Sequence, residues 1–92
     1  MISPISFLSN YTVKMKARSE KYQEKFWMFA SFSSDIVSNN EHCKTSVAFE
    51  KEKTRPYFNK GIINLSVPNE LDDTVEQYCK TNGIYFNKTK NP

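Results

Sequence analysis

Two short stretches of the chain combine cations with aromatic rings at alternate positions. The residues concerned are Lys14, Lys16 and Arg18 in the first stretch and Lys25, Trp27 and Phe29 in the second. Lysine and arginine bind phosphates, and aromatic rings stack on nucleobases, so this combination is typical of surfaces that hold single-stranded nucleic acid. The six residues are therefore predicted to form a nucleic-acid-binding surface, with single strands favoured over duplexes.

Exposed tryptophan and phenylalanine also mark protein interfaces. The alternative prediction is a small protein-binding module, such as a phage-encoded inhibitor or adaptor of a host protein. Such a module would use the same aromatic side chains, or it would pair an open strand edge with its partner.

No constellation of residues predicts catalysis. His42 is the single histidine, and its neighbour Cys43 would point to the opposite face of a strand. Asp72, Asp73 and Glu76 fall at the start of an expected helix, where the helix dipole favours acidic residues. The cysteine and histidine spacing matches no zinc pattern, and two glycines cannot build a phosphate-cradling loop. We expect no enzyme, no metal site and no cofactor.

The elements that would position the basic and aromatic residues follow from apolar alternation. Residues 11–18 and 25–32 each alternate with a period of two, which predicts a β-hairpin with residues 19–24 as its loop. In that hairpin Trp27 and Phe29 would share the face of the cations. A further strand is predicted at residues 44–50.

The clearest pattern lies between residues 61 and 83. Ile63, Leu65 and Val67 alternate with polar residues and predict a strand with one apolar face. A helix over residues 69–82 follows, with acidic residues in its first turn and Asn-Gly at its end, and Gly83 supplies the left-handed stop. Its buried face is expected to contain Leu71, Val75 and Tyr78.

Together these elements predict an α+β fold: a mainly antiparallel sheet of four or five strands, with one C-terminal helix packed on one face. Residues 1–92 form a single domain. Residues 1–10 are expected to be a loose N-terminal lead, residues 84–86 a short closing strand, and residues 88–92 a flexible tail.

Composition narrows the class of protein further. The net charge is +3, and residues 1–60 carry ten Lys or Arg against six Asp or Glu, net +4, so a polyanion would prefer this part. No apolar run reaches the ~20 residues of a membrane helix. We expect a cytoplasmic protein in which Cys43 and Cys79 are free and buried, with a disulfide between them as the alternative if the fold brings them together. So short a chain buries a limited core, which favours a homodimer or a bound partner over an isolated domain. The abundance of Asn, Lys, Ile, Tyr and Phe suggests the AT-rich genome of a phage or other mobile element.

Residues 62–87, which include INLSVPNELDDTVEQYCKTNG, resemble the ribbon-helix-helix family of repressors, the Arc and MetJ type. The likeness consists of an alternating strand that ends in proline, a helix and an Asn-Gly turn. It implies that the strands of two subunits pair and enter the major groove of DNA. Ile62, Asn64 and Ser66 would then face the groove, and Asn87 would begin a second helix that contacts phosphate.

The segments EKYQEKFWMF and TSVAFEKEKTRPYFNKGIINLSV bear a weaker likeness to small phage single-stranded-DNA-binding proteins of the OB type. This likeness rests on an aromatic and basic hairpin that is followed by two strands around a Pro-Tyr loop. It implies the same class of ligand as the basic and aromatic residues do.

Overall fold

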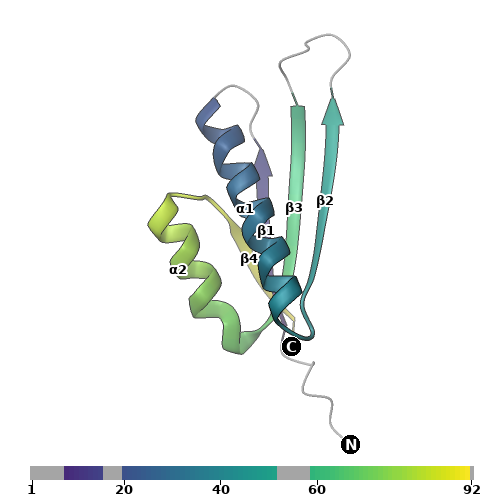
Figure 1. The fold of residues 1–92 in the computed structure, drawn as a ribbon, viewed down its shortest axis with the longest axis vertical. Coiled ribbons are helices and arrows are strands. Elements are labelled where there is room, and N and C mark those ends of the chain that lie inside the picture. Colours follow the sequence, from purple (N-terminus) through teal and green to yellow (C-terminus); the bar gives the residue numbers. More distant parts are fainter. Residues whose placement is uncertain (1–7, 16–19, 52–58, 92) are drawn as a thin grey trace, which may run out of the picture.

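The computed structural model describes residues 8–15, 20–51 and 59–91. Its elements run in the order β-α-β-β-α-β (Figure 1). They are β1 (Leu8–Met15), α1 (Glu20–Asn39), β2 (Lys44–Lys51), β3 (Asn59–Pro68), the short 3₁₀ helix η2 (Asn69–Leu71), α2 (Asp72–Asn82) and β4 (Asn87–Asn91).

The four strands form one sheet in the order β2-β3-β1-β4, and every neighbouring pair is antiparallel. This order and connectivity define the ferredoxin-like, or split βαβ, arrangement. The predicted α+β class with a mainly antiparallel sheet is confirmed. The C-terminal helix is confirmed as well, since η2 and α2 together span residues 69–82.

The predicted hairpin of residues 11–18 and 25–32 is wrong, because residues 25–32 lie within α1. The described buried side chains of α1 are Phe26, Phe29, Ser33 and Ile36, and their spacing of three, four and three residues is helical. Over eight residues rich in aromatics, alternation and helical spacing fit equally well. The helical period becomes clear only when residues 33–39, interpreted as a connection, are included.

One face of the sheet carries the core. Tyr11, Val13 and Met15 of β1 and Ile63, Leu65 and Val67 of β3 are all buried, which confirms the alternation predicted for both strands. Both helices cover this face (Figure 1). The ring of Phe26 packs so closely on Gly61 that a Cβ atom there would lie 2.6 Å from Phe26 Cζ.

Both cysteines are free and buried, as predicted. Cys79 is fully buried in α2, and burial raises its pKa to about 12. Burial also raises the pKa of Cys43. Both thiols therefore stay protonated at neutral pH and serve as small apolar core groups.

The end of α2 is fixed by Gly83 and by α1. Gly83 adopts the predicted left-handed conformation, with φ 65°, and the N–H of Ile84 donates to the carbonyl of Cys79 at 2.8 Å. Lys25 Nζ of α1 donates to the carbonyl of Asn82. These contacts fix the residue at which α2 ends and the link of residues 83–86 begins.

Both predicted ends of the domain need correction. Residues 87–91 form β4, which pairs with residues 8–12 of β1. The segment interpreted as a tail is thus an edge strand, and residues 8–10 of the expected lead begin β1. The closing strand predicted at 84–86 lies a few residues too early, because the link after Gly83 must first cross from α2 to the sheet.

Replacing Val75 by Asp should prevent folding. The Val75 side chain is fully buried on the sheet-facing side of α2, so the introduced carboxylate would be buried without a partner. The expected penalty is several kcal/mol, a large share of the roughly 5–15 kcal/mol that stabilises a domain. Urea denaturation followed by circular dichroism measures it. The neighbouring exposed residue gives a matched control, Thr74→Asp, which should fold normally. A cooperatively folded Val75→Asp protein of near-normal stability would contradict the packing of α2.

Candidate functional site

The sheet face opposite the helices is built from all four strands, and we call it the open face. Paired residues in neighbouring strands share a face, so the register assigns its members. Its polar members with described side chains are Asn10, Thr12, Lys14, Lys44, Ser46, Asn64, Ser66, Asn87 and Thr89. Its apolar members are Leu8, Ala48, Ile62 and Pro68.

Hydroxyl and amide groups fill the middle of the open face. Thr12 Oγ1 donates to Asn64 Oδ1 at 2.8 Å, and Ser66 Oγ donates to Asn10 Oδ1. The amide oxygens of both asparagines are occupied in this way, while their amide nitrogens make no hydrogen bond within the described part of the chain. The open face therefore presents hydrogen-bond donors to a ligand.

The described acidic side chains are confined to one side of the protein, whereas lysines lie on both sides. Lys14 and Lys44 stand at opposite ends of the open face, four positions apart along β3, or about 13 Å in the strand direction. None of the open-face side chains that the structure describes is acidic. Among the residues whose burial the structure describes, the acidic ones lie in the helical layer and in the turn after α1; they are Glu24, Asp35, Glu41, Glu70, Asp72, Asp73 and Glu76. Glu50 of β2 stands at an open-face position of the register, opposite Lys60. The open face is thus the side of the protein that favours an anion.

The structure separates the predicted basic and aromatic residues. Lys14 lies on the open face, whereas Lys25, Trp27 and Phe29 belong to α1 in the other layer. Phe29 is fully buried, and Trp27 is 50% exposed. Lys16 and Arg18 lie outside the described residues. These side chains do not share a face because residues 25–32 form part of α1, which packs on the sheet, instead of a strand that pairs with β1.

The residues that the ribbon-helix-helix resemblance assigned to DNA do share one surface. Ile62, Asn64, Ser66 and Asn87 all belong to the open face. In the repressor arrangement the strand would pair across a dimer, but β3 pairs with β1 and β2 of its own chain along both edges. Asn87 begins β4 rather than a second helix.

Several open-face residues were missed by the sequence reasoning. Asn10 and Thr12 alternate with the buried Ser9, Tyr11 and Val13, so their outward orientation could have been inferred from the same pattern that placed Lys14. Lys44 and Thr89 carry no comparable signal, because their place on this face depends on which strands are neighbours.

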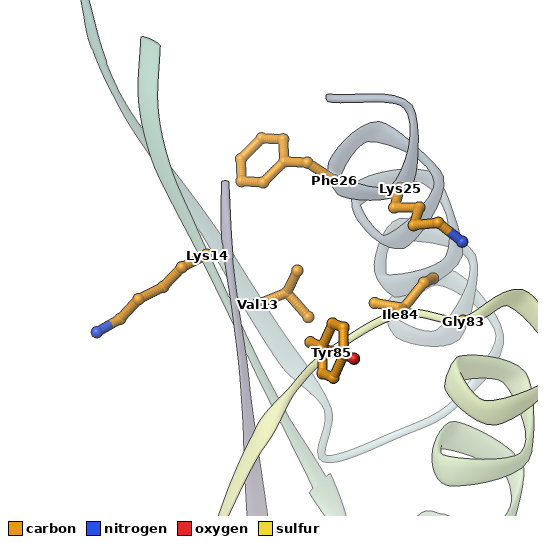
Figure 2. Close-up of a pocket in the computed structure, with 7 residues that line it drawn as sticks. All are labelled: Val13, Lys14, Lys25, Phe26, Gly83, Ile84 and Tyr85. Carbon is orange, nitrogen blue, oxygen red and sulfur yellow. The ribbon is translucent and has the colours of Figure 1, made fainter. Parts of the chain in front are cut away.

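A pocket of about 310 Å³ lies at the Lys14 end of β1, between β1, α1 and the link after α2 (Figure 2). It is lined by Val13, Lys14, Lys25, Phe26, Gly83, Ile84 and Tyr85. Figure 2 shows Lys14 projecting away from α1, across β1 from Phe26. Tyr85 is 81% exposed.

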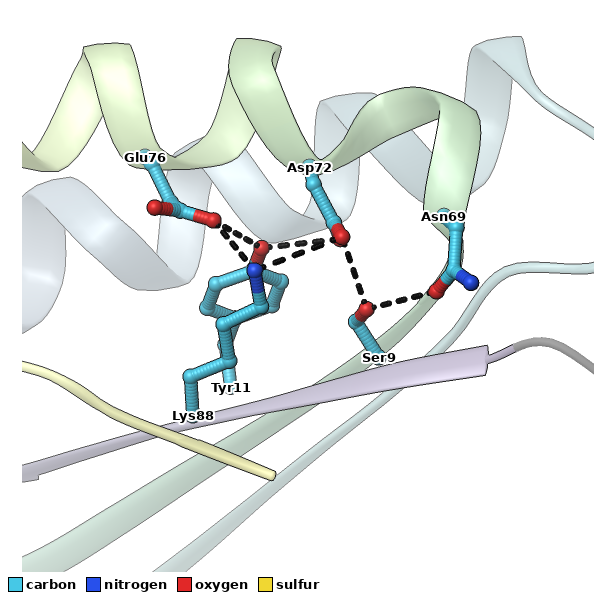
Figure 3. A network of polar contacts seen from close by, with 6 residues as sticks. All are labelled: Ser9, Tyr11, Asn69, Asp72, Glu76 and Lys88. Carbon is cyan, nitrogen blue, oxygen red and sulfur yellow. Dashed lines mark hydrogen bonds and ion pairs between the residues drawn. The ribbon is translucent and has the colours of Figure 1, made fainter. Parts of the chain in front are cut away.

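A polar network fastens α2 and β4 to β1 (Figure 3). The Tyr11 hydroxyl lies 2.9 Å from Asp72 Oδ1 and 3.0 Å from Glu76 Oε2, so it can donate to either carboxylate. Lys88 Nζ of β4 lies 2.6 Å from Glu76 and 3.3 Å from Asp72. Ser9 Oγ is within hydrogen-bond distance of Asp72, at 3.0 Å, and of Asn69, at 2.8 Å.

The network holds each of its groups in one protonation state. Burial by itself would raise the pKa of Asp72, but hydrogen bonds from Ser9, Tyr11 and Lys88 outweigh it and lower the pKa. The hydrogen bond from Lys88, followed by that from Tyr11, lowers the pKa of Glu76. Burial and the two carboxylates raise the pKa of Tyr11, and the bond to Glu76 raises that of Lys88. Because the carboxylates of Asp72 and Glu76 stay ionised and Tyr11 and Lys88 stay protonated, the network holds α2 and β4 against β1.

Within the described ranges, no group of three or more His, Cys, Asp or Glu side chains could hold a metal ion. No helix of that part of the chain is long and apolar enough to cross a membrane.

Comparison with known proteins shows no matching family model and no matching curated protein. Among solved structures, the de novo designed protein Ferredog-Diesel is similar over 89% of this chain and 83% of its own. The sequence identity is 10% and the TM-score is 0.45.

Stability should fall in acid because of this network. Carboxylates with lowered pKa values stabilise the fold above their ordinary pKa of about 4, and this stability is lost as pH falls through the lowered values. Tyr11→Phe leaves the two carboxylates with one donor fewer, which should cost about 1–3 kcal/mol at pH 7. It should also flatten the acid dependence, because the pKa values of Asp72 and Glu76 would rise toward their ordinary values.

Urea denaturation at a series of pH values from neutral to strongly acidic measures both effects. Tyr85→Phe is the matched control, since it removes a hydroxyl from an exposed ring. A Tyr11→Phe protein with the stability and acid dependence of the parent would show that the network does not hold α2.

Proposed function

We propose that this is a small, phage-like nucleic-acid-binding protein and that it holds single strands on its open face. The observation that carries the proposal is that the open face is polar and that none of its described side chains is acidic. Hydroxyls, amides and two lysines gather on one face of the sheet, while the described acidic side chains lie elsewhere. The proposed ligand is the one expected from the sequence, but the proposed site has moved from a hairpin to the sheet.

The chemistry of the open face suits a nucleic acid. Lys14 and Lys44 can neutralise phosphates, which makes binding dependent on salt. The amide nitrogens of Asn10 and Asn64 can donate to phosphate oxygens or base edges. With two described cations on this face, we expect weak binding that is strongest at low ionic strength.

The width of the sheet favours a single strand. Four strands about 4.8 Å apart span roughly 14 Å between the outer backbones, whereas the major groove of duplex DNA is about 12 Å wide. A two-stranded ribbon enters that groove, but this sheet is too broad. A single strand can instead lie across it, as RNA does on other exposed four-stranded sheets.

We place this function in the cytoplasm. Cys43 and Cys79 are free thiols, and thiols persist in reducing compartments. A genome or transcript of a phage would be met in that compartment.

A protein partner is the second candidate. Trp27 on α1 and Val47 on β2 are 50% and 47% exposed, which is unusual for such large apolar side chains. The two elements pack together where Thr45 Oγ1 donates to Ser33 Oγ at 3.0 Å. Since β2 is an edge strand of the sheet, a host protein could add a strand there and cover Trp27 and Val47.

Alanine substitution of the open-face lysines tests the nucleic-acid proposal. Fluorescence anisotropy of a labelled single-stranded oligonucleotide should show binding at low salt, and Lys14→Ala and Lys44→Ala should each weaken it. Each should also reduce the slope of log affinity against log salt by about 0.7. Lys80→Ala, on the exposed side of α2, is the matched control. Equal effects of all three substitutions would contradict an open-face site.

Trp27→Ala separates the two candidate functions. Because Trp27 lies in the helical layer, the variant should bind the same oligonucleotide within about twofold of the parent, a change below 0.5 kcal/mol. A loss equivalent to about 1–3 kcal/mol, the contribution of one stacked base, would place α1 in the binding surface and contradict the proposed site.

A further inference from the structure

The pocket beside Lys14 combines apolar and polar groups in a way that the open face does not. Val13, Phe26 and Ile84 provide apolar walls, and the ring of Tyr85 lies at the rim (Figure 2). Its volume of about 310 Å³ is near the lower end of the range for small-molecule sites, roughly 300–1,000 Å³. The volume of the pocket therefore suits a small ligand.

The backbone of β1 adds hydrogen-bonding groups to this pocket. β4 pairs with β1 only from Leu8 to Thr12. Over Val13–Met15, no strand in the described chain pairs with β1 on the β4 side. Successive residues of an antiparallel strand turn their N–H and C=O groups to opposite edges. At least one of these three residues therefore presents a donor and an acceptor toward the side of the pocket.

The pocket adjoins the open face at the edge of β1. Lys14 lines the pocket, while its side chain projects away from α1 on the open-face side of β1 (Figure 2). Tyr85 lines the same pocket and precedes β4, whose pairing with β1 ends at Thr12. A nucleic acid strand that leaves the open face around this edge of β1 would pass Lys14 and then meet Tyr85. Lys25 Nζ, held at the carbonyl of Asn82, adds a positive charge on the α1 side.

We propose that this pocket accepts one unstacked nucleobase of the bound single strand, with Tyr85 as the stacking ring. A base has an apolar π face and an edge of donors and acceptors, which match the walls of the pocket and the β1 edge. This inference rests on the proposed function of the open face. It adds the place where a base, rather than a phosphate, is recognised.

Two substitutions of Tyr85 test the stacking, and both should fold because the ring is 81% exposed. Tyr85→Ala should weaken binding of a fluorescein-labelled oligothymidylate by roughly 5- to 150-fold, the effect of losing one stacked base. Tyr85→Phe, which keeps the ring, should bind within twofold of the parent. Lys80→Ala again serves as the unaffected control.

A second probe reports on the base itself. When one thymine is replaced by 2-aminopurine, the parent protein should change the fluorescence of this base on binding, and Tyr85→Phe should do the same. Tyr85→Ala at a saturating concentration should remove most of the change.

The possible failures are distinguishable. If the parent does not bind the oligonucleotide at low salt, the proposed function of the open face fails, and this inference fails with it. If the parent binds and depends on Lys14 and Lys44 but Tyr85→Ala binds equally well, the open-face function stands and the base pocket is overturned. If Tyr85→Phe is as weak as Tyr85→Ala, the hydroxyl matters rather than the ring, and stacking is overturned.

Discussion

Burial of one face of β1 and β3, the two central strands, is the constraint on which the rest of the structure depends. Their large apolar residues recur at every second position from Tyr11 to Met15 and from Ile63 to Val67, so one side of the sheet forms the core. Both helices must cover that side (Figure 1). The other side consequently remains open and polar, and it becomes the largest surface on which the four strands can act together.

The polar network under α2 supplies hydrogen-bond partners for a hydroxyl group that this arrangement buries. Tyr11 lies in the core, and its hydroxyl needs a partner there. Asp72 and Glu76 provide acceptors one helical turn apart, and Lys88 of β4 forms ion pairs with both, which offsets one of their two negative charges. These two carboxylates therefore lie between α2 and the sheet, on the side opposite the open face, and β4 is tied to the helix that precedes it.

The same geometry explains why the proposed binding surface has two different parts. The middle of the open face carries hydroxyls and amides on four paired strands, which can follow a backbone but offer no aromatic ring among the described side chains. At the Lys14 end β4 has not yet begun, so the edge of β1 and Tyr85 lie next to a pocket. Contacts to phosphates and a contact to a base would therefore occur at separate places along one strand.

Local sequence patterns determined those segments in which a regular hydrophobic period continues over many residues and in which capping or turn residues mark the ends. The alternation of Ile63, Leu65 and Val67, the helix that follows it and the left-handed Gly83 all occur as expected, because each depends on neighbours a few residues away. Residues 25–32 taken by themselves fit a strand and a helix equally well, and the tertiary structure shows the helix because the sheet buries Phe26, Phe29 and Ser33 at helical spacing. Strand order was also beyond the sequence, because contacts such as Lys88 with Glu76, or Asn10 with Ser66, join segments whose pairing is set by the packing of the whole chain.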